Sequence, residues 1–344
     1  MKKTALFLLK LSLIGGIFAF LFWQAAQYDS FELLFTLKNK HWEFLLAAVL
    51  CQMVAVSITF IRWKWLVVAL GIPFTYRDSF RLGFLGLMLN LAPVGIVGGD
   101  GIKAYLLAQK NPDHRARSLA SVVVDRMIGL IALFFVATFL VCWSGFAFRD
   151  ETLAKGAGQL VFWLTGIAVV GIGVVFLPFF SQGHIEKQID RIPFCGIILG
   201  KLIRALLLYR EHKFCLFAST FVSLFVHLIF GLSLYCVAKG LLSDVPTITE
   251  NMVVSPIANL TSMIPLAAGP YEVVVNQLYP LLTTSPKPGI GLIVALGFRF
   301  ISILVSALGV LYFLASKDER RLGGAGGKQC PMSELESDAT DLFP

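Results

Sequence analysis

The sequence lacks the residue patterns that usually mark an enzyme or a metalloprotein. Its six cysteines are scattered, with no CxxC pair and no Cys/His ligand spacing, which argues against a disulfide framework or a structural zinc. No GxxxxGK[ST] loop is present, so ATP-driven transport is not indicated. There is also no Ser/His/Asp set and no carboxylate cluster on a loop. We therefore expect no enzymatic activity, no metal and no cofactor.

Hydrophobic residues dominate the chain instead. They make up 57% of its 344 residues, against roughly 45–50% in soluble domains. The net charge of +8 does not indicate a nucleic-acid partner, because Lys and Arg collect in the cytoplasmic loops of membrane proteins and set their orientation. The composition predicts an all-α polytopic membrane protein.

Six apolar windows reach the roughly 20 residues that a helix needs to cross a bilayer. They are Leu6–Ala25, Trp42–Ile61, Leu119–Trp143, Gln159–Phe180, Phe214–Val237 and Gly289–Ala315. The first exceeds the length of a signal-peptide core, so we interpret it as a retained span. Basic flanks place both termini in the cytoplasm. We expect an integral membrane domain over residues 1–316 in the inner (plasma) membrane, and a disordered cytoplasmic tail over residues 317–344.

Two further segments, Phe80–Leu107 and Val253–Pro280, carry Pro, Gly and polar residues where a spanning helix would be uniformly apolar. Irregular backbone at membrane depth is tolerated only where it is buried in protein or lines a wet cavity. Basic residues flank the first segment on both sides, so it should return to the cytoplasm, and the second then begins and ends outside. The sequence predicts six transmembrane helices plus two oppositely oriented re-entrant hairpins, as an inverted repeat would produce.

The most specific local pattern is Gly98-Gly99-Asp100, with Lys103 one turn further on. Glycines allow a tight turn and leave amides free to contact a ligand. A helix that starts near Asp100 would favour an anionic group at its N-terminus, and Lys103 would add charge. The alternative is that the glycines permit close packing and Asp100 caps the helix. The two roles are compatible.

Charged residues also interrupt the apolar windows. Arg299 lies well inside the last window, where an arginine costs at least about 2.5–3.5 kcal/mol unless it has a partner or a wet cavity. We predict that Glu272 is that partner, in either a structural pair or a site for headgroup binding or proton coupling. Asp125 and Arg126 are adjacent, so they point in different directions and need not pair. Arg126 binds a ligand or extends to the interface. For the isolated His227 we expect a hydrogen bond to a neighbouring helix rather than a role in proton relay.

From Leu6 to Ala315 the chain resembles the flippase-like family typified by the membrane region of lysylphosphatidylglycerol synthase. The residues that carry the resemblance are Asn90, Pro93, Gly98, Gly99, Asp100, Lys103, Asp125, Arg126, Gly129, Pro265, Gly269 and Glu272. The family usually has Arg where Lys103 stands and Glu where Asp125 stands. Its Pro-Gly-Gly core is here Ala-Ala-Gly269-Pro270.

The resemblance implies translocation of a phospholipid or a polyprenyl- or isoprenoid-linked lipid through a central polar cavity. Apart from Gly129, these residues are, together with Arg299, the candidate substrate-binding residues. The synthase's soluble aminoacyl-transferase domain has no counterpart in this sequence, so lysyl transfer is not expected. The alternative is a non-catalytic membrane subunit that holds a lipid or glycolipid for a lipid-modifying or glycosyltransferase partner.

Overall fold

The computed structural model describes residues 41–90, 96–148, 151–176, 205–264, 269–283 and 289–315, and the regular elements in these ranges are all helical. Five helices are long and apolar enough to cross a bilayer. They are α3 (Trp42–Ala69), α6 (Arg115–Trp143), α7 (Thr152–Phe176), α10 (Lys213–Leu241) and α13 (Ile290–Ala315). These match five of the six predicted spans. The predicted span Leu6–Ala25 and the tail over 317–344 lie outside the described residues.

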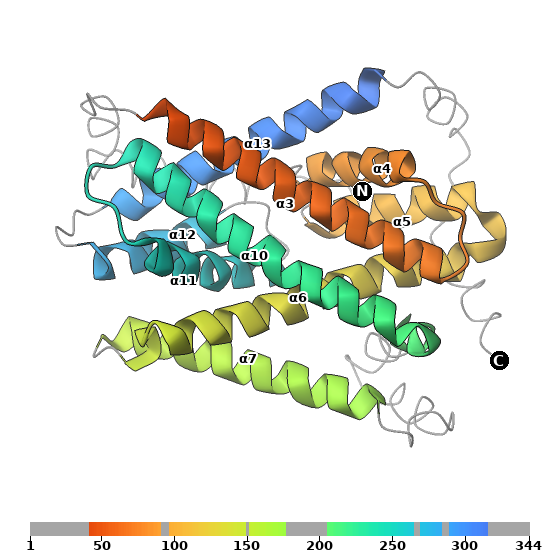
Figure 1. Ribbon diagram of the computed structural model, residues 1–344, viewed down its shortest axis with the longest axis horizontal. Helices are drawn as coiled ribbons and strands as arrows, with labels where there is room; N and C mark the ends of the chain where they lie inside the picture. The colour runs from red at the N-terminus through yellow and green to blue at the C-terminus, as the bar shows by residue number, and fades with distance from the viewer. Residues whose placement is uncertain are drawn as a thin grey trace, which may run out of the picture.

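The long helices form a bundle around the pair α3 and α10, which pack along each other and run in opposite directions (Figure 1). Helix α7 lies at one edge of the bundle against α6 (Figure 1). Its large apolar side chains remain exposed, Trp163 by 74% and Ile167 by 66%. An apolar surface of this kind suits contact with lipid chains rather than water.

Helix α3 continues past Ile61, where the sequence predicted its end, because its first basic residue is buried and paired. Arg62, the first residue after the predicted window, would mark a cytoplasmic loop by its charge, but it lies within the helix and is only 4% exposed. Its Nε donates to Asp125 Oδ1 at 2.9 Å and its Nη1 donates to Ser223 Oγ at 2.6 Å. With the charge compensated inside the bundle, the helix ends only at Ala69, before Gly71 with a φ of 78°.

The two interrupted segments each form a pair of short helices. The first pair is α4 (Tyr76–Asn90) and α5 (Ile96–Lys110). The second is α11 (Ile248–Asn259), which continues through η5 (Leu260–Met263), and α12 (Pro270–Leu278). In both cases the two helices pack against each other. The short turns η1 (Pro112–His114), η2 (Phe146–Phe148), η4 (Arg210–His212) and η6 (Tyr279–Leu281) lie at the ends of longer helices.

A side-chain contact closes the outer end of each pair. Lys110, the last residue of α5, places its Nζ 2.6 Å from Oδ1 of Asp78 in the first turn of α4. In the second pair the Tyr279 hydroxyl donates to Oδ1 of Asn251. The outer ends of each pair therefore meet, and the break between its helices lies at the opposite, inner end. Each pair is a hairpin in this geometric sense.

The two hairpins point toward each other from opposite ends of the bundle (Figure 1). The outer ends of α4 and α5 lie on the right of Figure 1 and those of α11 and α12 on the left, with both breaks near the middle. Each hairpin also packs on the long helix that follows the other one, α4 on α13 and α11 on α6. If α3, α4, α5 and α6 are exchanged for α10, α11, α12 and α13, the main packing contacts among these eight helices are preserved. The fold thus repeats itself internally.

Candidate functional site

A cavity of about 250 Å³ lies where the inner ends of the hairpins meet the long helices. Residues from α3, α4, α6, α10, α11, α12 and α13 line it, so both halves of the fold contribute. The polar part of its lining includes Gln52, Asn90, Arg126, Asn259, Tyr271 and Arg299. Polar side chains thus gather where the helices are broken, as expected for irregular backbone at membrane depth.

The predicted pair of Glu272 and Arg299 is present. Arg299 Nε donates to Glu272 Oε1 at 2.7 Å, and Glu272 is only 1% exposed. The other carboxylate oxygen of Glu272 accepts the backbone N–H of Gly269 at 2.7 Å. Gly269 has a φ of 108°, which residues with a Cβ rarely adopt. Glu272 therefore caps the start of α12 and fixes Arg299 at the cavity wall.

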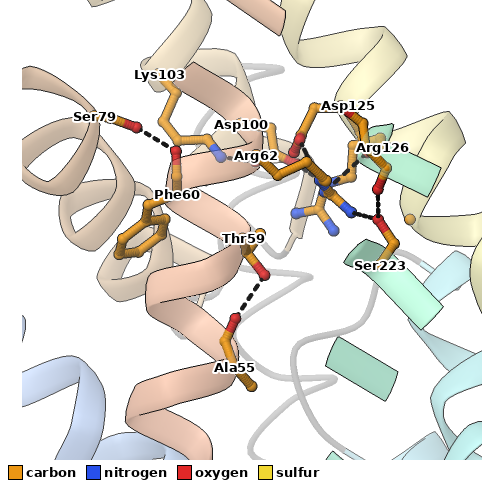
Figure 2. Close-up of polar contacts among 12 residues, drawn as sticks. Ala55, Thr59, Phe60, Arg62, Ser79, Asp100, Lys103, Asp125, Arg126 and Ser223 are labelled. Atoms are coloured by element: carbon orange, nitrogen blue, oxygen red, sulfur yellow. Dashed lines mark hydrogen bonds and ion pairs between the residues drawn. The ribbon is translucent and has the colours of Figure 1, made fainter. Parts of the chain in front are cut away.

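Asp100, on α5 of the first hairpin, binds two basic side chains, one from α5 and one from α6 (Figure 2). Arg126 Nε donates to its Oδ2, and Lys103 Nζ lies 3.1 Å from its Oδ1. Asp100 and Arg126 are both conspicuous in the sequence, but they are 26 residues apart, and the sequence did not indicate that they pair. Arg126 lines the cavity, whereas Asp100 lies behind it.

The expectation that Gly98, Gly99 and Asp100 form a turn before a helix is wrong. Helix α5 begins at Ile96, so all three lie within its first turns. The glycine is needed for packing instead: a Cβ on Gly99 would collide with the side chain of Asn90 and with the backbone carbonyl of Gly86. The lack of a side chain lets α4 and α5 cross closely, which is the alternative that the sequence left open.

Lys103 and Asp125 do not line the cavity. The stem of Lys103 occupies the space that a side chain on Gly86 would fill, and its ammonium lies 4.9 Å from the centre of the Trp63 ring. Direct contact of Lys103 with a headgroup stays a prediction. Asp125 belongs to a separate buried cluster with Arg62 and Ser223 (Figure 2), which joins α3, α6 and α10.

His227 lies next to that cluster and forms the inter-helix contact that the sequence predicted. Its Nε2 is 2.9 Å from the Gly129 carbonyl oxygen, which links α10 to α6. Gly129 also lies beside the Arg62 guanidinium, because a Cβ added to this glycine would be 3.6 Å from Arg62 Nη1. These contacts are structural in character, because they join three long helices away from the cavity wall.

The chemistry of the cavity repeats with the fold. In each half an asparagine ends the first short helix, an acid lies near the start of the second, and an arginine follows on the next long helix. The acid and the arginine are 26 residues apart in the first half and 27 in the second. Sequence reasoning missed Asn259 and Tyr271, which line the cavity. An alignment of the two halves on their acid–arginine pairs would have identified Asn259 as the counterpart of Asn90.

The remaining predicted site residues fall into two groups. Gly269 and Glu272 stand directly behind Arg299, as Asp100 stands behind Arg126. Pro93 and Pro265 lie outside the described residues. The structure thus brings Asn90, Arg126 and Arg299 together around one cavity.

The family model described as the lysylphosphatidylglycerol synthase TM region matches residues 7–309. A UPF0104 membrane protein of Methanocaldococcus jannaschii is 23% identical over 158 residues, which cover 45% of this chain and 44% of that protein. A UPF0104 membrane protein of Methanothermobacter thermautotrophicus is 22% identical over 165 residues, covering 47% and 45%. The matched part thus spans less than half the length of either relative. No solved structure matches the chain. With its apolar helices and a match over nearly all of its length, the chain belongs to the lysylphosphatidylglycerol synthase TM region family of integral membrane proteins.

Proposed function

We propose that the protein moves a lipid across the inner membrane, with the headgroup passing through the cavity between the two hairpins. The observation that carries this proposal is the cavity itself: charged and polar side chains from both halves form part of its wall, within a bundle of apolar helices. In transporters, interrupted helices from internal repeats typically meet at a substrate site near the middle of the membrane. The substrate is a phospholipid or a polyprenyl- or isoprenoid-linked lipid.

The proposal includes a membrane topology. The α4–α5 hairpin is re-entrant from the cytoplasm and the α11–α12 hairpin is re-entrant from outside, with Leu6–Ala25 as the sixth span. The charge distribution supports this orientation. The end of the bundle that carries the base of the first hairpin has basic residues such as Lys110 and Arg115. The other end has acidic residues such as Asp244 and Glu250. Basic residues favour the cytoplasmic side.

A reconstitution experiment tests the function. The purified chain is placed in vesicles that contain a fluorescent phospholipid in both leaflets, and a membrane-impermeant quencher reports how fast inner-leaflet lipid reaches the outside. We expect faster exposure than in protein-free vesicles. As a matched pair, Arg299→Gln at the cavity should slow exposure, whereas Trp163→Leu on the exposed face of α7 should not.

A lipid-holding subunit is the second candidate, and the same cavity supports it. The two functions differ in one result. A protein that binds lipid with the cavity residues intact and yet does not accelerate exposure is a holder for a partner enzyme and not a flippase. In either role we propose that the chain itself is not an enzyme, since the buried carboxylates Asp125 and Glu272 are paired with Arg62 and Arg299.

A further inference from the structure

Both cavity arginines are anchored in the same way. Arg126 and Arg299 each bind their acid through Nε. Within the described part of the chain, the Nη atoms of these two residues donate no hydrogen bond. The two Nη atoms of a guanidinium form the planar fork that binds oxyanions bidentately. Since both residues line the cavity, two such forks, one from each half of the fold, border the same space.

A third donor is the hydroxyl of Tyr271. This side chain lines the cavity and its residue is 8% exposed, yet its hydroxyl has no hydrogen-bond partner among the described residues. Its ring is fixed, because it stacks on Phe298 at 5.5 Å between centroids and lies 6.0 Å from the Arg299 guanidinium. A buried hydroxyl is rarely left unpaired in a folded protein. An acceptor atom of a ligand would complete its bonding.

The charges around the site leave room for one anion. Four basic side chains bind three acidic ones in the two ion-pair groups and the neighbouring cluster, so the set carries one positive charge in excess. Its members are Arg62, Lys103, Arg126, Arg299, Asp100, Asp125 and Glu272. The excess lies in the first hairpin group, where Lys103 and Arg126 share Asp100, so an anion that reaches Arg126 would balance it. A phosphodiester carries a single negative charge.

We propose that the cavity binds the phosphodiester of a lipid headgroup between Arg126 and Arg299, with the Tyr271 hydroxyl as an additional donor. This deepens, and rests on, the proposed lipid translocation. A tetrahedral oxyanion directs oxygens to several sides at once, so it can accept from two forks and a hydroxyl. A sugar or an amine without phosphate would leave both forks unpaired. The cavity volume of about 250 Å³ suits a headgroup and leaves the acyl chains outside.

Binding to the full chain in mild detergent tests the proposal with three probes: a short-chain phosphatidylglycerol, a short-chain glycosyl diacylglycerol without phosphate, and inorganic phosphate. We expect the phosphatidylglycerol to bind best. Tyr271→Phe removes only the hydroxyl, and Arg126→Lys and Arg299→Lys keep the charge but remove the fork. Each should weaken that binding by about tenfold. Tyr105→Phe and Arg117→Lys, away from the cavity, should leave it unchanged.

The outcomes separate this inference from the function on which it rests. Equal binding of the glycolipid, or full binding by all three cavity variants in folded form, overturns the phosphodiester site even if lipid exposure in vesicles is accelerated. Phosphate-dependent binding without accelerated exposure supports the site and rejects translocation. If inorganic phosphate binds as tightly as the phospholipid, the ligand of the site is free phosphate and not a lipid headgroup. Thermal unfolding of each variant shows that it is folded.

Discussion

The two acid–arginine pairs occupy equivalent places in the two halves, but they differ in burial and in charge. The Asp100 side chain is 12% exposed and binds two cations, and that of its partner Arg126 is 42% exposed. The Glu272 side chain is 1% exposed, binds one cation and also caps a helix. The second pair is therefore a rigid, neutral part of the framework. The first is more accessible and keeps a positive charge, so we expect an incoming anion to meet it first.

The largest effect should come from breaking the buried pair. Glu272→Gln leaves Arg299 without its counter-charge, and removing one partner of a buried pair typically costs about 3–5 kcal/mol. Asp100→Asn should cost less, because Arg126 is more exposed than Arg299. Thermal unfolding in detergent compares the two variants. A loss for Asp100→Asn that equals or exceeds the loss for Glu272→Gln would remove the distinction between the pairs.

A double-mutant cycle sharpens the same comparison. Glu272→Gln combined with Arg299→Gln should destabilise the protein less than the two single changes summed, with a coupling of about 0.5–3 kcal/mol. Additive effects would show that the contact does not contribute.

Measuring the rate of lipid exposure against pH separates a structural role of this pair from proton coupling. We expect a rate that does not change with pH, whereas a pH-dependent rate that is lost in Glu272→Gln would show that Glu272 exchanges protons during transport.

A smaller effect is expected at Lys103. Lys103→Met keeps the apolar stem that packs at Gly86 and removes the charge beside Asp100. Because Lys103 does not line the cavity, binding of phosphatidylglycerol should fall by less than the roughly tenfold loss expected for Arg126→Lys. Lys103→Glu should weaken binding further, without a matching loss of folded protein. If charge reversal leaves binding intact, Lys103 contributes only to topology.

The smallest effect concerns the outer ends of the hairpins. Asp78 is partly buried, which raises its pKa, but hydrogen bonds from Lys110 and Thr75 outweigh this and hold the pKa below its usual value. A lowered pKa means that the contact stabilises the fold above about pH 4, the usual pKa of Asp. That contribution is lost as the pH falls through the lower, folded-state value.

Hydrogen exchange at the base of α4 measures this loss. After correction for the intrinsic slowing of amide exchange at low pH, protection should fall on acidification in the unaltered chain and fall less in Asp78→Asn. The contact is half exposed on its Lys110 side, so the change is modest. The neutral contact of Asn251 with Tyr279 should show no such dependence. Equal pH responses at the outer ends of the two hairpins would show that the Asp78–Lys110 contact is not the cause.

Local patterns in the sequence predicted the spans well, since hydropathy over 20 residues is a property of neighbouring residues. The Glu272–Arg299 pair was also predictable, because an arginine inside an apolar window demands a partner. The burial of Arg62 was not, since its partners Asp125 and Ser223 are 63 and 161 residues away. The start of α5 at Ile96 was missed for a similar reason: the glycines serve a contact with α4 that no local pattern records.

The central claim is that two equivalent hairpins enter the membrane from opposite faces and meet at one cavity. Side-specific labelling tests it most directly, in a chain freed of its six cysteines and carrying one new cysteine at a time. Pro73→Cys precedes the first hairpin, Asp113→Cys follows it and Ser243→Cys precedes the second, and all three positions are exposed. In intact cells we expect an impermeant thiol reagent to label Ser243→Cys, and to label Pro73→Cys and Asp113→Cys only after the membrane is opened. Labelling of Pro73→Cys and Asp113→Cys from opposite faces would contradict the account.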